Sequence, residues 1–219
     1  MKKEPSIPVP ALAEPGTYEE VFRDGDSVLL TVRARWPRLE ESCPGCRRVN
    51  RYYEALADRW KKRWAGPLLA QAKAAAGPDT PPWEARLDFT VTLFEAGSFS
   101  LYWESSEDVG ARRPRRVRQG DLWRLPEGIP VTLRELLPPR RWWRGPVLEQ
   151  VRRQIGQRVN AGEAVFYEDW PSLASRKFSP GRFYLTPDGP VVFYPIETLA
   201  PAMEGFPSFL LQIGSEPVT

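Results

Sequence analysis

The sequence of 219 residues contains no histidine. This absence excludes serine and cysteine hydrolases that rely on a histidine base, histidine-ligated zinc sites and imidazole proton shuttles. The glycine-rich motifs that cradle phosphate groups after a strand are missing as well. We therefore expect a protein that is not an enzyme and that needs no cofactor and no metal.

Long apolar runs are also absent. No stretch approaches the roughly 20 apolar residues that cross a bilayer, so no transmembrane segment is expected. The first residues carry two lysines but no apolar signal-peptide core. As it stands, the sequence predicts a cytoplasmic protein, or an extracytoplasmic one if a membrane anchor has been removed.

Cysteine is scarce, and both cysteines lie in one motif, Cys43-Pro44-Gly45-Cys46, between a predicted strand and a predicted helix. A helix N-terminus stabilises a thiolate, as thiol–disulfide exchange requires. However, no βαβ order typical of thioredoxins follows, and no other Cys or His completes a zinc site. Two interpretations stay open, a redox pair and a structural pair joined on oxidation, and the sequence favours the second.

Apolar residues make up 42% of the chain and include nine Trp and ten Phe, which predicts one aromatic-rich globular core. Residues 1–16 contain four prolines and are interpreted as a flexible tail. The remaining residues, 17–219, form one predicted domain, with an N-terminal part at about 17–80 and a C-terminal part at about 84–215.

The hydrophobic pattern predicts the order of the elements. Leu30, Val32, Ala34 and Trp36 alternate with polar residues as in a half-buried strand, which Pro37 ends. An amphipathic helix follows, whose aromatic stripe, including Tyr52 and Trp60, is interpreted as core. The further elements, in chain order, are a helical continuation after Gly66-Pro67, a hairpin at 87–93 and 99–103, a polar arginine-rich connection at 105–119, a return to strand at 121–126, helices at 132–137, 146–160 and 169–178, a hairpin at 183–186 and 191–194, and a strand at 209–213.

This order has no repeating βαβ rhythm. It predicts a single α+β domain with an antiparallel or mixed sheet, helices packed on one face and a long N-terminal helix.

Two segments combine arginine with tryptophan, in spite of a net charge of only +3. This combination suits contact with phosphates and stacking on bases, which makes nucleic acid or another polyanion a candidate partner. The alternative is a pair of solvated loops whose tryptophans pack on the core. The candidate binding surface consists of Trp103, Arg112, Arg113, Arg115, Arg116, Arg118, Arg140, Arg141, Trp142, Trp143 and Arg144.

Several short segments, taken in order, resemble a known family. They are Trp36-Pro37-Arg38-Leu39, 49–53, 99–102, Gly120-Asp121-Leu122-Trp123, 131–137, 182–194, 199–201 and Gly205. Together they are similar to a family of bacterial domains of unknown general function, typified by the extracellular domain of the lysozyme-sensing anti-sigma-V factor. A related module precedes the catalytic domain of some peptidoglycan deacetylases.

The resemblance covers roughly residues 28–213 and departs from the family at two places. Residues 107–113 replace a Gly-Gly-Ala-His-Gly-like turn, and residues 196–201 lack two tyrosines of the family. The resemblance implies a binding or sensing module for lysozyme or cell-wall material. Animal-type lysozyme is strongly basic and this chain is basic too, so charge disfavours lysozyme itself.

The sequence thus predicts a non-catalytic binding or sensing module whose ligand is a cell-wall glycan or a protein. Polyanion binding through the arginine and tryptophan segments is the first alternative. Thiol–disulfide exchange through Cys43 and Cys46 is the second.

Overall fold

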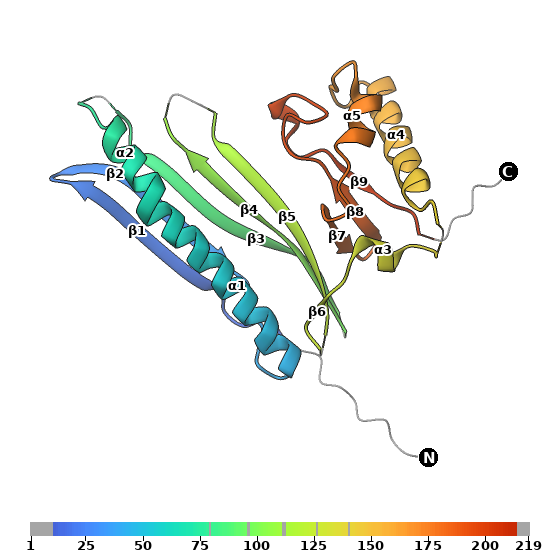
Figure 1. The fold of residues 1–219 in the computed structure, drawn as a ribbon, viewed down its shortest axis with the longest axis horizontal. Coiled ribbons are helices and arrows are strands. Elements are labelled where there is room, and N and C mark those ends of the chain that lie inside the picture. The colour runs from blue at the N-terminus through green and yellow to red at the C-terminus, as the bar shows by residue number, and fades with distance from the viewer. Residues whose placement is uncertain are drawn as a thin grey trace, which may run out of the picture.

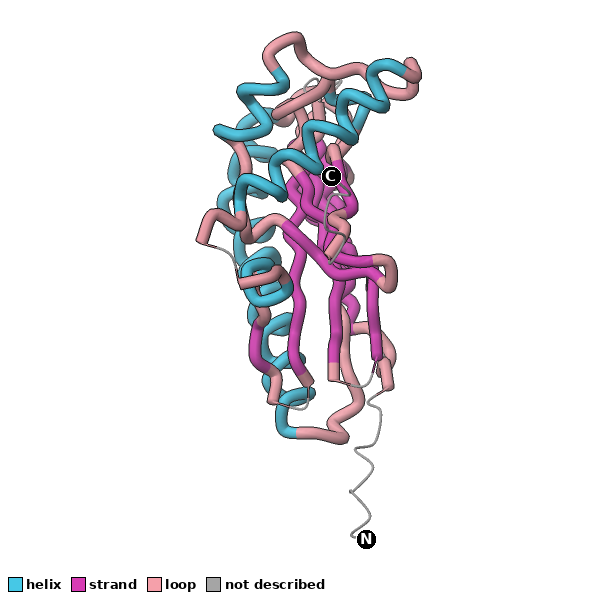
Figure 2. The backbone as a smooth tube through the Cα atoms, turned by 90° about the vertical axis from the view of Figure 1, so that its right-hand side faces the viewer, coloured by secondary structure: helices cyan, strands magenta, loops and turns pink. Residues whose placement is uncertain are grey.

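The computed structural model describes residues 11–78, 80–95, 97–110, 113–125, 127–139 and 141–213. A long helix lies along a six-stranded sheet, and a smaller part with three strands and further helices packs beside it (Figure 1). In the side view the long helix runs alongside the strands (Figure 2). Within the described residues, none of the helices has the length and apolar character needed to cross a membrane. The predicted α+β class is confirmed.

The larger sheet is mixed. Its strand order is the chain order, and every neighbouring pair is antiparallel except β2 and β3, which are parallel. A parallel pair needs a crossover connection, which the long helix supplies. The strands are β1 (Gly16–Asp24), β2 (Ser27–Trp36), β3 (Trp83–Glu95), β4 (Ser98–Asp108), β5 (Arg115–Arg124) and β6 (Ile129–Pro130).

The crossover consists of α1 (Pro44–Arg63), a π-helical segment η1 (Trp64–Leu68) and α2 (Leu69–Ala75). The helix begins where the Cys43 sulfur accepts a hydrogen bond from the Cys46 N–H at 3.0 Å. Basic residues fill the last turn of α1, where they complement the helix dipole. Pro67 lies inside η1, whose wider turn lets the helical segment continue into α2.

The predicted position of the long helix at the N-terminus is wrong, because two strands precede it. The sequence signal missed β1, most of whose residues are exposed and which therefore has no clear apolar alternation. Within the predicted tail, Ala13 N–H donates to the Arg38 carbonyl and the Ala11 carbonyl accepts from Glu40 N–H, both at 2.9 Å. Residues 1–10 lie outside the described residues.

The predicted polar connection at 105–119 is mostly strand. β4 extends to Asp108, and β5 begins at Arg115 and pairs with β4 as far as Arg124. The hydrophobic pattern did not predict this pairing, because charged side chains interrupt the apolar alternation on both strands.

The C-terminal part contains a separate antiparallel sheet and its own apolar core. The predicted hairpin and the predicted helices are confirmed, and the expected last strand is shorter. The elements are α3 (Leu133–Leu136), α4 (Arg144–Asn160), α5 (Trp170–Arg176), β7 (Phe183–Thr186), β8 (Gly189–Phe193), the 3-10 helix η2 (Ala202–Glu204) and β9 (Ser208–Leu210). Thr132 and Glu135 form the predicted capping box at the start of α3.

The two parts meet where β7 lies on the face of β3, β4 and β5 that is turned away from α1. Gly120 allows this contact, because a Cβ atom at this position would lie 1.9 Å from the Phe183 carbonyl oxygen. The buried Ser100 hydroxyl accepts from Leu185 N–H at 2.8 Å, and the Thr92 hydroxyl donates to the Leu185 carbonyl at 2.7 Å. Polar side chains of the larger sheet thus hold β7 in place.

Candidate binding groove

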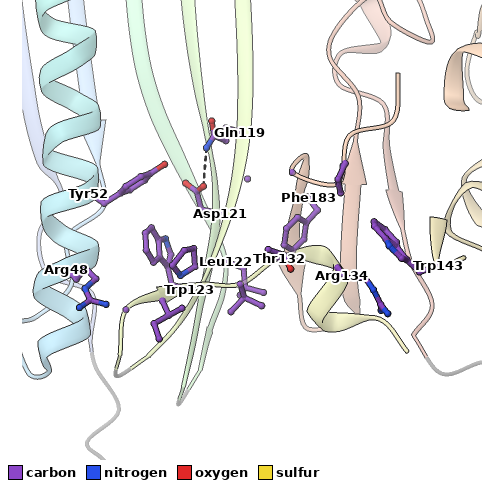
Figure 3. A pocket seen from close by; sticks show the side chains of 17 residues that line it. Arg48, Tyr52, Gln119, Asp121, Leu122, Trp123, Thr132, Arg134, Trp143 and Phe183 are labelled. Carbon is purple, nitrogen blue, oxygen red and sulfur yellow. Dashed lines mark hydrogen bonds between the residues drawn. The ribbon is translucent and has the colours of Figure 1, made fainter. Parts of the chain in front are cut away.

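A cavity of about 780 Å³ opens beside β5, between the N-terminal end of α1 and the C-terminal part (Figure 3). Apolar and aromatic side chains dominate its wall, as is typical of ligand pockets. The lining residues are Arg48, Tyr52, Gln119, Gly120, Asp121, Leu122, Trp123, Gly128, Ile129, Pro130, Val131, Thr132, Arg134, Trp143, Pro180, Gly181 and Phe183.

A second hollow, of about 370 Å³, continues along the same side of α1. It shares Tyr52 and Gln119 with the first cavity. Its remaining lining residues are Leu56, Arg59, Trp60, Arg63 and Trp103. Positions 48, 52, 56, 59, 60 and 63 recur at helical spacing, so one face of α1 forms the wall of both hollows. We call the two together the β5 groove.

Asp121 is the polar centre of the groove. Its carboxylate accepts hydrogen bonds from the Tyr53 hydroxyl at 3.1 Å and from the Gln119 amide at 3.3 Å. The Tyr53 hydroxyl in turn accepts from the Trp123 indole at 2.9 Å. Burial raises the pKa of Asp121, although its hydrogen-bond donors partly offset the effect. The carboxyl is therefore a strong acceptor held in an apolar wall.

Tyr52 is half-buried and lies between α1 and β5. Its ring makes edge-on contacts with Tyr53, at 5.0 Å between centroids, and with Trp123, at 5.1 Å. Burial raises the pKa of Tyr52, and the charge of Asp121 raises it further. The hydroxyl thus stays protonated at neutral pH and offers a donor to the groove.

This arrangement suits recognition of a ligand by shape. Rigid aromatic rings supply contact area, while Asp121 and Tyr52 supply an acceptor and a donor that orient the ligand. Within the described chain, no cluster of three or more Cys, Asp or Glu side chains could hold a metal ion.

The predicted arginine surface on β4 and β5 is largely paired. Arg118 forms an ion pair with Glu104 at 2.7 Å and stacks over Tyr102, and Arg116 lies 3.6 Å from Glu104. Arg113 pairs with Glu197 at 2.8 Å.

Two further residues of that surface differ in exposure, and a third lies outside the described residues. Arg115 is exposed, whereas Trp103 is buried against Trp60, with 6.3 Å between ring centroids. Arg112 lies outside the described residues.

The second arginine and tryptophan segment lies between α3 and α4, away from the first (Figure 1). Trp142 is 76% exposed, with Arg141 over its ring, while Trp143 lines the cavity and contacts Phe178. Arg144 lies over the ring of Trp143, and Arg140 is outside the described residues. Of the predicted surface residues that the structure describes, only Trp103 and Trp143 line the groove.

Cys43 and Cys46 are joined by a disulfide, and Cys46 is fully buried. The bond closes the first turn of α1, next to the contact between Gly45 and Gly128. A disulfide is compatible with both a structural pair and a redox pair, so thiol–disulfide exchange stays a prediction.

The chain matches no protein-family profile and no curated protein. In structure it is similar to a DUF3298 family protein from Pseudomonas aeruginosa PAO1, with a TM-score of 0.60 and 13% identity over 92% of this chain and 88% of that one. It is also similar to a member of the DUF3298 family from Bacteroides fragilis NCTC 9343, with a TM-score of 0.65 and 12% identity over 96% of both chains.

These likenesses show a shared fold. They support the broader interpretation of the sequence, a bacterial domain of unknown function, and give no support to the finer resemblance to the anti-sigma-V factor or to deacetylases.

The hydrophobic pattern missed most of the groove. It assigned the aromatic stripe of α1 to the core, which is confirmed for Tyr53 and Trp64. Tyr52 and Trp60 instead stay half-buried and line the open face of α1. The sequence did not predict Asp121 as a binding residue, because a single acidic side chain in a predicted strand is usually exposed to solvent. The only hint was its place in Gly120-Asp121-Leu122-Trp123, one of the segments that resembles the family.

Proposed function

We propose that this chain is a non-catalytic binding module whose ligand occupies the β5 groove. The observation that carries the proposal is the cavity of about 780 Å³, lined mainly by aromatic and apolar side chains around the carboxyl group of Asp121. An apolar pocket with a few convergent polar groups is the expected place for a ligand. A protein segment and a cell-wall glycan are the two ligand classes, as expected from the sequence.

The alternative of polyanion binding has weaker support. Glu197 pairs with Arg113, and Arg116 and Arg118 share Glu104, so part of this positive charge is already compensated. The second arginine segment lies apart from the first (Figure 1). A polyanion would have to displace these ion pairs before it gained its own.

Gly181 offers a way to fill the cavity without disturbing the fold. A Cβ atom added at this position would meet no atom within 4 Å, and the φ of Gly181 is not in the left-handed region. Gly181 lines the cavity, so Gly181→Trp adds a large ring at its wall, which we expect to occupy part of the cavity. Gly156→Trp is the matched control, because Gly156 has the same open space but lies in α4, outside the groove.

The test follows the backbone amide and indole NMR signals of the protein during titration with two probes, soluble muropeptides and a synthetic mixture of decapeptides. We expect at least one probe to shift the indole signals of Trp123 and Trp143 in the wild type and in Gly156→Trp. The shifts should disappear in Gly181→Trp. Signals that stay unmoved by both probes, or that move equally in Gly181→Trp, would contradict the proposal.

A further inference from the structure

Among the described residues, the outer edge of β5 lacks a partner strand over most of its length. β6 pairs with Trp123 and Arg124 only, and the last backbone bond on this side joins Val131 N–H to the Leu122 carbonyl at 2.8 Å. The chain then turns into α3 at Thr132. Within the described part of the chain, no strand pairs with residues 115–121 on the side opposite β4.

The direction of the free backbone groups follows from this pairing. The carbonyls of Leu122 and Arg124 point away from β4, because they accept from Val131 and Gly128. In an antiparallel strand, alternate residues point the same way. The N–H and C=O groups of Gly120, Arg118 and Arg116 therefore also point outward, and they form an unused ladder.

The groove runs beside this ladder. The wall of α1 from Arg48 to Arg63 is about 22 Å long at 1.5 Å per residue. The free edge from Arg115 to Asp121 spans about 20 Å at 3.3 Å per residue. An extended segment of about six residues matches both lengths. Every second side chain of such a segment would face Tyr52 and Trp60.

The charge of the groove specifies its partner further. Among the described residues, Asp121 is the only acidic one that lines either hollow. Arg48 and Arg59 line the wall of α1 without a carboxylate partner in the described chain, whereas Arg63 is paired with Glu107. On the free edge, Arg115 has no ion pair among the described residues, and Arg116 and Arg118 share the one carboxylate of Glu104, so the edge keeps a net positive charge. Two copies of this cationic edge repel each other, which leaves an acidic partner as the complementary one.

We propose that the ligand of the β5 groove is an extended acidic segment of another protein, which adds to the outer edge of β5 as a further strand. Main-chain hydrogen bonds to Arg116, Arg118 and Gly120 supply affinity, and alternate apolar side chains in the groove supply specificity, as in other cases of strand addition. This inference rests on the proposed function, since it names the ligand of the same groove.

The experiment selects binders from a displayed library of random decapeptides with the whole chain as bait. We expect the selected peptides to carry several Asp or Glu residues, with apolar residues at every second position. Selection of basic or neutral sequences alone would overturn the inference.

Arg116 provides a matched pair of variants. Arg116→Pro removes an outward N–H without removing a bond to β4, because proline is tolerated on the free side of an edge strand. Arg116→Ala removes the same charge and keeps the N–H. We expect Arg116→Pro to weaken binding of a selected peptide roughly tenfold or more, and Arg116→Ala to weaken it less than about threefold.

A second measurement leaves the protein unchanged. Methylation of single backbone nitrogens in the selected peptide should abolish binding at every second position, because only alternate residues of a strand bond to one neighbour. Uniform tolerance of methylation, or equal effects of Arg116→Pro and Arg116→Ala, would overturn strand addition. If muropeptides shift the groove signals and no peptide is selected, the inference fails while the proposed function stands. If neither probe binds, both fail.

Discussion

The two parts of the molecule differ in how many polar side chains their cores contain. The buried polar residues, Asn50, Ser100, Ser105 and Glu107, all belong to the larger sheet and its helix. The described core of the C-terminal part is apolar apart from Tyr194, whose hydroxyl donates to the Ala174 carbonyl at 2.8 Å.

The difference indicates a division of roles. A buried polar group costs free energy unless it is hydrogen-bonded, so each such group in the larger part needs a fixed partner. The hydrogen bonds of these groups fix the positions of α1 and β7 on the sheet. The C-terminal part has an apolar core and forms the second wall of the groove beside β5.

The contact between the two parts is the point where a single change has the largest effect. In Gly120→Ala the new Cβ would overlap the Phe183 carbonyl oxygen, and β7 would have to move. We expect a loss of more than about 3 kcal/mol in the free energy of unfolding. Urea unfolding followed by tryptophan fluorescence measures it. Gly181→Ala, which has open space, should lose less than about 1 kcal/mol, and equal losses would contradict the role of Gly120.

The ion pair between Arg63 of α1 and the buried Glu107 gives the next effect. Arg63 donates two hydrogen bonds of 2.6 Å to Glu107, whose side chain is 6% exposed. In Arg63→Met, the Glu107 carboxylate would retain, among its described hydrogen bonds, only the one from the Trp64 indole N–H at 3.3 Å. We expect a loss of about 2–3 kcal/mol, because an uncompensated charge stays buried.

Lys62→Met is the control for this change, since Lys62 is exposed on the same helix. It should shift the urea midpoint by an amount that corresponds to less than about 0.5 kcal/mol. A comparable shift in both variants would show that Glu107 does not need Arg63.

The Ser100 hydroxyl ties the two parts together with a smaller effect. Ser100→Ala leaves the Leu185 N–H without its acceptor, which we expect to cost about 1–2 kcal/mol. Ser106→Ala, on the same strand but half-exposed, should change the urea midpoint little. Amide hydrogen exchange at Leu185 should become faster in Ser100→Ala alone, and unchanged exchange would refute the link.

Local periodicity predicted the elements whose residues alternate clearly. The β2 strand, the aromatic helix and both hairpins follow from spacing within about ten residues. β1 and the first half of β5 were missed because one is mostly exposed and the other is rich in arginine. An edge strand protected by charge carries little apolar signal.

The groove could not be predicted from the sequence, for a different reason. It arises where the crossover helix α1 lies beside β5, which comes more than fifty residues later in the chain. The helical stripe predicted which face of α1 is aromatic, but not that Tyr52 and Trp60 would line an open wall. The burial of Asp121 depends on that same distant contact.

Asp121 allows the groove to be studied through the pH dependence of stability. Burial raises the pKa of this carboxyl in the folded state, so the folded protein favours the protonated form. The stability contributed by this group is fully present below the unfolded pKa, near 3.8, and is lost as the pH rises through the raised folded pKa. Asp121→Asn removes the titration. The wild type should therefore lose stability relative to Asp121→Asn as the pH rises above about 4, when urea midpoints are compared from pH 3.5 to 7. The opposite slope would show that the bonds from Tyr53 and Gln119 outweigh burial, and that the groove presents a stabilised carboxylate.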